Sequence, residues 1–163
     1  MIGNGDAYLR AGPVVVGFEE VPAAEPPFGV GSLGIRTGSA EDAAAFGNQV
    51  DFIGMPLADV AQLGYWVYTT GENITIDPGN LPSVQFEIDA NLTPPPAIDF
   101  TTANFVPPAQ PPGWHEVDAV ATGEWYLTGA EGDATSCNQT TTCTLAELQT
   151  AVPDATIFTA SFS

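Results

Sequence analysis

The sequence predicts an all-β protein, an antiparallel β-sandwich of the jelly-roll kind with two short helices. Three observations predict it: apolar and polar residues alternate in many short segments, 17 Gly and 15 Pro residues interrupt the chain, and few segments carry a helical pattern. Long connections between the segments favour a jelly roll over a meander of hairpins. A chain of 163 residues has room for one hydrophobic core, so we expect a single domain over 1–163.

The first third of the chain predicts three strands. Tyr8–Phe18 is rich in β-forming residues, and Gln49–Ile53 also has strand character. Ser32–Thr37 alternates, with Leu33 and Ile35 on the same side. We therefore expect Ser32–Thr37 to bury one face.

The segment after these strands predicts the first helix. Leu57, Val60 and Leu63 are spaced three residues apart, Pro56 stands near the expected first turn, and Gly64 follows where a helix commonly ends. This spacing predicts a helix of two turns.

The middle of the chain predicts two strands with a turn between them. Tyr65–Thr70 is the richest β-forming run, and Asp77–Asn80 has Pro and Gly at the positions of a type II turn. Ser83–Leu92 alternates almost throughout, as a half-buried antiparallel strand does. Its apolar side is Val84, Phe86, Ile88 and Ala90, and its polar side is Gln85, Glu87, Asp89 and Asn91.

The last third predicts more strands and the second helix. Thr144 and Glu147 have the spacing of a capping box, so a short helix begins there and ends before Pro153. The expected strands are Phe100–Val106, Trp114–Ala121, Glu124–Leu127 and Thr156–Phe162.

The charge balance restricts the partners and the location. Two basic residues stand against 20 acidic ones, which gives a net charge of −18. This charge excludes a nucleic-acid partner, because nothing neutralises phosphates, and it argues against binding to an anionic membrane surface. No apolar run is long enough to span a membrane, so we expect no membrane insertion. Charged residues make up only 13% of the chain, which fits an extracellular, cell-surface or virion-surface protein. Adaptation of the protein to salt or acid is the alternative.

The two cysteines predict a disulfide. Cys137 and Cys143 enclose a polar segment with no nearby His or Cys to complete a zinc site. A disulfide implies an oxidising compartment, and two free thiols are the alternative. Sequons at Asn73, Asn91 and Asn138 are candidate glycosylation sites.

The polar side of the Ser83–Leu92 strand is the candidate ligand surface. Saccharides bind to polar side chains next to exposed aromatic rings. We prefer Trp114 and Trp125 as these rings, and Trp66, Tyr68 and Tyr126 are the other aromatic residues that could serve. Calcium is a possible cofactor because carboxylates suit it, although no EF-hand spacing is present. The candidate ligand-binding residues are Gln85, Glu87, Asp89, Asn91, Trp114 and Trp125.

A catalytic interpretation of the same strand is weaker. Glu87-Ile88-Asp89 resembles the active-site strand of jelly-roll β-glucanases, which adds a second Glu as the acid. Asn91 and Leu92 follow instead, and an amide cannot donate the proton that a leaving group needs. His115 is the single histidine, and no Gly-x-Ser-x-Gly motif is present. We therefore expect no enzyme activity.

Four motifs in order resemble a group of bacterial secreted domains with a concanavalin-like jelly-roll fold. They are Gly54–Leu63, Gln85–Asp89, Trp114–Asp118 and Pro153–Ile157, with Val117 in place of the second Trp of the third motif. The resemblance spans residues 18 to 158 and implies the fold and an exported protein, with no particular activity.

These observations predict a non-enzymatic extracellular binding or adhesion module, with a glycan as its partner. One alternative is a structural subunit of a filament, sheath or virion, in which copies pair through edge strands such as Thr156–Phe162. The other alternative is a diverged glycoside hydrolase.

Overall fold

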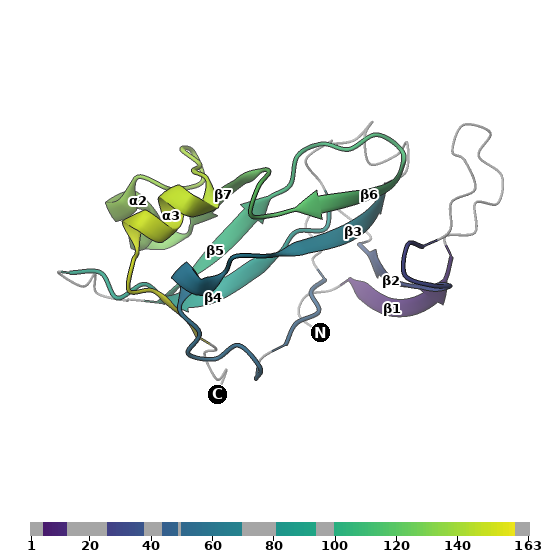
Figure 1. Cartoon of the computed structure of the whole chain (residues 1–163), viewed down its shortest axis with the longest axis horizontal. Coiled ribbons are helices and arrows are strands. Elements are labelled where there is room, and N and C mark those ends of the chain that lie inside the picture. The colour runs from purple at the N-terminus through teal and green to yellow at the C-terminus, as the bar shows by residue number, and fades with distance from the viewer. Residues whose placement is uncertain are drawn as a thin grey trace. The chain divides into compact units, whose positions relative to one another are not determined.

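The computed structural model has mostly β structure, with antiparallel sheets and two α-helices in the part that it describes (Figure 1). Contacts divide the chain into two compact units, and the prediction of a single domain stays a prediction. Unit 1 is Met1–Asn48, Trp66–Pro82 and Ala109–Glu116, and unit 2 is Gln49–Tyr65, Ser83–Pro108 and Val117–Ser163. The described residues are 5–12, 26–37, 44–48, 50–69, 81–93 and 100–158.

Unit 2 contains a four-stranded sheet in the order β7-β5-β4-β8, and all neighbouring strands are antiparallel. Three of its strands lie where the sequence predicts strands. The fourth, the last in the chain, covers the start of the strand predicted over Thr156–Phe162. The strands are β4 (Gln85–Asp89), β5 (Phe100–Val106), β7 (Glu124–Leu127) and β8 (Thr156–Ile157).

One face of this sheet forms the core of unit 2. The cross-strand pairs Ala103↔Leu127 and Phe105↔Trp125 place four apolar side chains on the same inner face. Phe86 stacks on Trp125 with ring centroids 5.8 Å apart, and the indole N–H of Trp125 donates to the carbonyl of Ala119 at 2.9 Å. The opposite, outer face of the sheet carries the polar half of each alternating strand.

Other parts of unit 2 cover both edges of this sheet. Beside β8, the N–H of Gly54 donates to Ile157 and the N–H of Leu57 donates to Ala155, both at 2.8 Å. Beside β7, Trp125 and Cys143 exchange two backbone hydrogen bonds of 2.7 and 2.9 Å. The backbone groups of the outer strands are therefore partly paired within the chain, which protects the sheet against edge-to-edge association.

The helix predicted over Leu57–Leu63 is wrong. The structure has only a 3-10 turn, η1 (Leu57–Asp59), and Gly64 belongs to a strand. The N–H of Leu57 pairs with β8, and the side chain of Gln149 donates to the carbonyls of Leu57 and Val60 at 2.9 and 3.2 Å. The two carbonyls bound by Gln149 would accept backbone hydrogen bonds in an α-helix, while the three-residue spacing still buries Leu57 and Val60.

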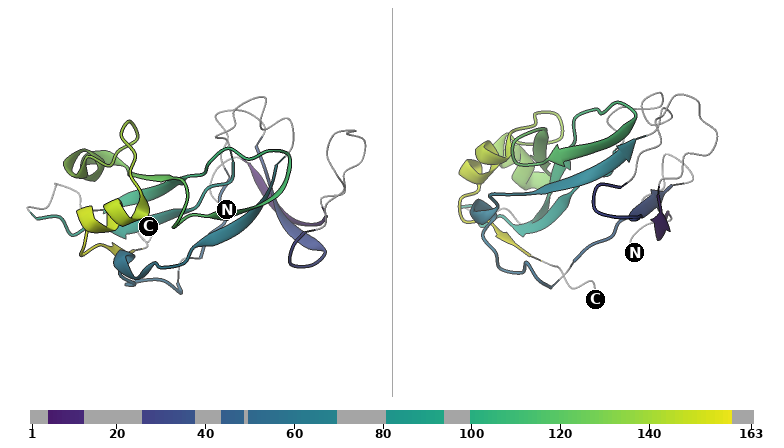
Figure 2. Two further views of the ribbon diagram at one scale, coloured as in Figure 1. Left: turned by 45° about the horizontal axis from the view of Figure 1, so that its top comes forward. Right: turned by 45° about the vertical axis from the view of Figure 1, so that its right-hand side comes forward.

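Two short α-helices contact β7 (Figure 2). The predicted capping box begins α3 (Leu145–Ala151): Thr144 accepts from the N–H of Glu147, and its own N–H donates to the Glu147 carboxylate at 2.8 Å. The backbone N–H of Thr144 and its hydroxyl both donate to the Glu147 carboxylate, which lowers the pKa of Glu147. The other helix, α2 (Gly129–Thr135), is absent from the sequence prediction. A Cβ at Gly132 would collide with the carbonyl of Leu127, so this glycine lets α2 lie close to β7.

Unit 1 contains the antiparallel ribbon of β1 (Asp6–Ala11) and β2 (Gly31–Arg36). The predicted strands are confirmed here, but the buried face expected for β2 is wrong, because Leu33 and Ile35 are 43% and 41% exposed. A second pair of strands, β3 (Gly64–Thr69) and β6 (Gly113–Asp118), continues from one unit into the other. β6 ends before the predicted Ala121 because Asp118 accepts from the N–H groups of Val120 and Ala121.

The strand predicted over Gln49–Ile53 is also wrong where the structure describes it. Residues 51–54 form a turn with Gly54 at φ 79°, and Phe52 and Ile53 are exposed. The predicted turn Asp77–Asn80 and the ends of the strands predicted to reach Phe18 and Phe162 lie outside the described residues. No helix within the described ranges is long and apolar enough to cross a membrane.

Candidate functional site

The outer face of the four-stranded sheet gathers polar side chains from three strands. The register pairs Gln85 with Asn104 and Glu87 with Thr102 across β4 and β5, and it pairs Asn104 with Tyr126 across β5 and β7. Paired residues project to the same side of a sheet. We define the polar face as Gln85, Glu87, Asp89, Thr102, Asn104 and Tyr126; each of them is partly or fully exposed.

Two phenylalanine rings border the polar face. Phe100 is opposite Asp89, and the N–H of Phe158 donates to the carbonyl of Glu87, so the two rings approach over β4. They stack with centroids 4.4 Å apart, and Phe100 remains 51% exposed. The face therefore offers hydrogen-bonding groups beside exposed aromatic surface.

The polar face continues into a groove where β7 ends. The groove has a volume of about 320 Å³, near the lower end of the range typical of small-molecule sites. Tyr126 belongs to both the polar face and the groove. The lining residues are Tyr126, Leu127, Thr128 and Gly129 from the end of β7, Asp133 from α2, and Asn138, Gln139 and Thr140 from the loop between the cysteines.

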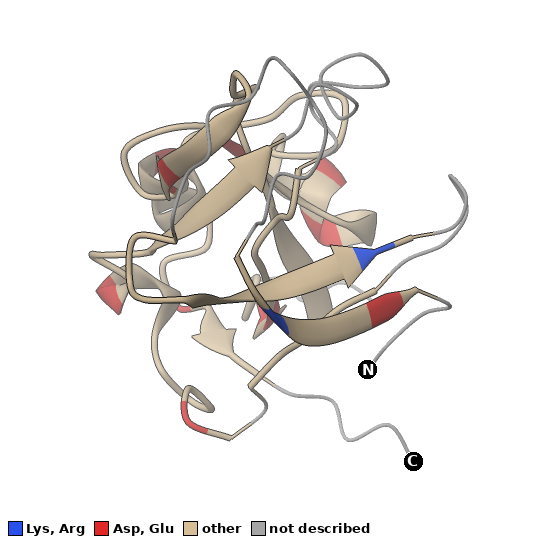
Figure 3. Cartoon of the chain, turned by 90° about the vertical axis from the view of Figure 1, so that its right-hand side faces the viewer, with Lys and Arg blue, Asp and Glu red and all other residues tan. Residues whose placement is uncertain are grey.

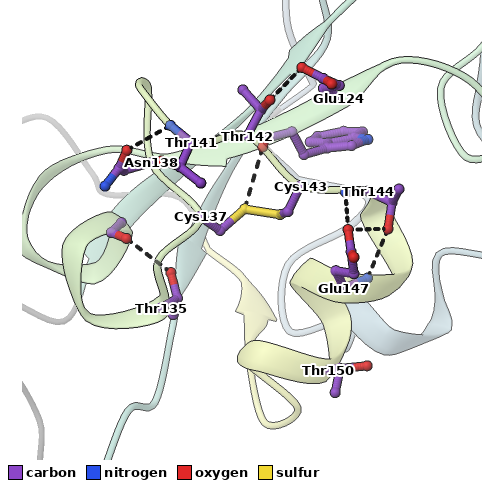
Figure 4. The surroundings of a disulfide bond; sticks show 12 residues. Glu124, Thr135, Cys137, Asn138, Thr141, Thr142, Cys143, Thr144, Glu147 and Thr150 are labelled. Atoms are coloured by element: carbon purple, nitrogen blue, oxygen red, sulfur yellow. Dashed lines mark hydrogen bonds between the residues drawn. A yellow bond between two sulfur atoms is a disulfide. The ribbon is translucent and has the colours of Figure 1, made fainter.

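The disulfide confirms the pairing predicted from the sequence and fixes one wall of the groove. Cys137 and Cys143 are joined, and Figure 4 shows the loop that they close. Cys137 is buried, whereas Gln139, Thr140 and Thr141 in the loop that the bridge closes are exposed. Its carbonyl accepts from the N–H of Leu127 at 2.8 Å, and Thr142 donates to the Glu124 carboxylate. The loop is thereby attached to β7 at both ends.

Hydrogen bonds within the loop orient its polar side chains. The Oδ1 of Asn138 accepts from the N–H groups of Thr140 and Thr141 at 3.0 Å and from the Thr140 hydroxyl at 2.8 Å. Its Nδ2 donates to Asp133 at 3.2 Å. This side chain links the loop to α2, so the two walls of the groove are tied together.

Three of the six candidate ligand-binding residues lie together. Gln85, Glu87 and Asp89 share the outer face of β4, as the alternation predicts. Asn91 lies past the end of the strand with φ 51°, and its Nδ2 donates to the carbonyl of Asp154 at 2.9 Å. The structure therefore does not bring Asn91 into the row with the other three.

The two candidate tryptophans lie elsewhere. Trp125 has 0% exposure and belongs to the core, so its indole cannot meet a ligand. Trp114 belongs to unit 1, where its ring contacts Tyr68 with centroids 5.4 Å apart. The indole N–H of Trp114 and the hydroxyl of Tyr68 are both buried without a hydrogen-bond partner.

Sequence reasoning missed Thr102 and Asn104 and ranked Tyr126 below Trp125. The alternation of Glu124–Leu127 carried the signal, because it places Trp125 beside the apolar Leu127 and Tyr126 on the other side. Thr102 and Asn104 are likewise the polar alternates of β5. Asn138–Thr140 line the groove because the tertiary structure brings the loop between the cysteines beside β7, and no local sequence pattern shows this contact.

The acidic side chains of the polar face are few. Glu87 and Asp89 are two residues apart on one strand, and the residue that follows in the glucanase pattern is Asn91. Within the described segments, no three His, Cys, Asp or Glu side chains gather in a way that could hold a metal ion. The arrangement offers hydrogen bonding and ring stacking.

The candidate glycosylation sites differ in their surroundings. Asn73 lies outside the described residues. Asn91 is exposed and Asn138 is half-buried, and each side-chain nitrogen already donates to an oxygen of the protein.

Comparisons with family models, with curated proteins and with solved structures gave no match to this chain.

Proposed function

We propose that this chain is a non-enzymatic saccharide-binding module that holds its ligand on the polar face and in the adjoining groove. The observation that carries the proposal is the register of β4, β5 and β7, which aligns the exposed Gln85 and the half-buried Asn104 and Tyr126 across the polar face. Amide groups supply both donors and acceptors, which match the paired hydrogen-bonding needs of sugar hydroxyls. The Tyr126 ring offers a surface on which a sugar can stack.

The geometry of Asn104 supports the same role. Its Nδ2 donates to the carbonyl of Thr102 at 2.9 Å, which fixes the orientation of the amide. The second N–H and the carbonyl oxygen of such an amide can then serve a ligand without loss of further rotamer entropy.

The charge of the site indicates a neutral glycan. Glu87 and Asp89 lie on the polar face and Asp133 lines the groove, in a chain with a net charge of −18. Uronic and sialic acids would meet like charges, which costs binding free energy. Neutral hexoses and amino sugars meet no such repulsion.

We propose that the site does not hydrolyse its ligand. Glu87 and Asp89 lack a second Glu on the strand, and Asn91 departs from it in a left-handed conformation. A diverged glycoside hydrolase would need an acid from another element to protonate the leaving group. Release of reducing ends from any bound glycan would contradict this part of the proposal.

The wider setting is part of the proposal. The disulfide supports an oxidising, extracellular or surface location. The antiparallel sheets and the ordered motifs support a sandwich of jelly-roll type and a relationship to the secreted concanavalin-like domains. Calcium remains a proposed aid to binding through Glu87 and Asp89, without being required by the hydrogen-bonding groups.

A glycan array followed by calorimetry tests the proposal. The array presents neutral and acidic glycans in calcium and in a chelator, and we expect signals from neutral glycans alone. For the strongest neutral ligand, Tyr126→Ala removes a stacking ring and should weaken binding about tenfold, the equivalent of about 1.4 kcal/mol. Gln85→Ala and Asn104→Ala should each weaken it about fivefold through a lost hydrogen bond.

Gln62→Ala provides the matched control. Gln62 is exposed in the connection before β3 and contributes nothing to the polar face, so its replacement should leave affinity unchanged. Equal losses for Gln62→Ala and Gln85→Ala, or an array without any neutral signal, would contradict the proposal.

A further inference from the structure

The β1–β2 ribbon exposes apolar side chains on one of its faces. Leu9 is 87% exposed, and it is directly opposite Leu33, which is itself exposed. Ile35 is exposed on the same face, opposite Ala7. A two-stranded ribbon is marginal alone in water, so pairing with further strands would stabilise it.

The same ribbon carries both basic residues of the chain. Arg10 lies on β1 and Arg36 on β2, and Figure 3 shows the two basic positions on this ribbon. With Asp6 they give the ribbon a net charge of +1 in a chain of −18. The ribbon carries charges of both signs, so two copies of it can set opposite charges against each other. The rest of the chain has acidic residues and no Lys or Arg, so two copies repel each other there.

The outer edge of β1 is open among the residues that the structure describes. The N–H of Gly12 donates to the carbonyl of Val30 at 2.9 Å, which makes these two a hydrogen-bonded pair. Because such pairs alternate in an antiparallel ladder, residues 6, 8 and 10 direct their backbone groups toward β2. Residues 7, 9 and 11 direct theirs to the outer edge, where they can pair with another strand.

We propose that this edge pairs with β1 of a second copy, antiparallel about a two-fold axis at Tyr8. This register places Asp6 opposite Arg10 of the other copy, twice, and Ala7 opposite Leu9. Asp6 is already opposite Arg36 within the ribbon, so each Asp6 would lie between two arginines. The Asp6–Arg10 pairs fall at positions without backbone hydrogen bonds, where side chains approach most closely.

The central position also fits this arrangement. The ring of Tyr8 leans over Gly34, because a Cβ on that glycine would lie 2.7 Å from the ring. The tyrosine therefore points toward β2 and leaves the two-fold axis clear. The result is a four-stranded sheet in the order β2-β1-β1-β2, with the leucines of both copies on one continuous face.

Sedimentation of the full chain with two matched proline variants tests the proposal. Leu9→Pro removes an N–H from the outer edge of β1, whereas Leu33→Pro removes one from the outer edge of β2. The wild type should dimerise between about 10 and 500 µM, as a small interface does. Leu9→Pro should weaken dimerisation at least tenfold, and Leu33→Pro should leave it within about twofold.

A charge swap tests the register even if the prolines disturb the ribbon. Arg10→Asp alone places two carboxylates opposite each other and should weaken dimerisation about tenfold. Asp6→Arg with Arg10→Asp and Arg36→Asp restores opposite charges both between the copies and within each ribbon, so this swap should recover most of that loss. A monomeric wild type throughout this concentration range, equal effects of the two prolines, or no recovery by the swap would overturn the proposal.

Discussion

Loss of the disulfide should destabilise the protein by about 2 kcal/mol. Cys137 and Cys143 are six residues apart, so the bridge closes a loop of seven residues. Loop-closure entropy for that length corresponds to about 2.3 kcal/mol at 25 °C in the chain-entropy account. For a chain of this size, such a change lowers Tm by about 5–9 °C.

Reduction and mutation should differ in a defined way. Reduction keeps both sulfur atoms, so it tests the loop term alone. Cys137→Ala with Cys143→Ala also empties space in the core, since Cys137 is 2% exposed, and should cost about 1 kcal/mol more. Urea unfolding of the oxidised, reduced and doubly substituted proteins measures both quantities.

The loop also forms one wall of the groove, so loss of the disulfide should affect ligand binding as well as stability. With the bridge reduced, Asn138–Thr140 lose their fixed position relative to Tyr126, so saccharide affinity should fall together with stability. A free energy of unfolding that changes by less than about 0.5 kcal/mol on reduction would contradict this prediction. It would mean that hydrogen bonds at Asn138 and Thr142 hold the loop without the disulfide.

Three further predictions concern stability. Thr144→Ala removes the cap of α3 and should cost about 1 kcal/mol in urea unfolding, and Thr144→Ser should restore most of it. Gly123→Ala should cost about 3 kcal/mol or more, because Gly123 has φ 80° and a Cβ there would lie 2.5 Å from Phe105; a loss below about 1 kcal/mol would contradict this packing. Burial raises the pKa of Tyr65 from about 10 to about 12, so its contribution to stability is complete below pH 10 and is lost as the pH rises to about 12. Two pKa units correspond to about 2.7 kcal/mol, which screening around a half-exposed ring reduces to about 1 kcal/mol. Tyr65→Phe should abolish this part of the alkaline loss when unfolding is measured at pH 9 and 11.

Elements defined by local pattern were predictable from the sequence. The period of two in β4 and β5 sets their buried faces, and Thr144 with Glu147 sets the start of α3. These features depend on residues within one segment. The disulfide was predictable for a similar reason, because the two cysteines are close in sequence.

Elements defined by distant partners were not predictable. The spacing of Leu57 and Val60 fits a helix and a 3-10 turn equally, and pairing with β8 decides between them. The helix α2 contains Gly129 and Gly132, which disfavour helices, and contacts with Leu127 support it. A single sequence does not show which distant segment will supply such contacts.

The candidate site was predictable in part. The polar alternates of β4 define the strand on which the site is built, but the companion residues come from β5, β7 and the disulfide loop. Trp125 was chosen for its residue type although its strand parity assigns it to the core. Parity within a strand was the better guide to exposure than aromatic character.

Mapping a bound saccharide by NMR shows whether the polar face is the binding site. The wild type is titrated with the neutral glycan that gives the strongest array signal, and backbone amide shifts are followed. We predict the largest shifts at Gln85–Asp89, Thr102–Asn104 and Tyr126, and their loss in Tyr126→Ala. Shifts confined to Trp66 and Trp114, or no shifts at saturating glycan, would contradict this prediction.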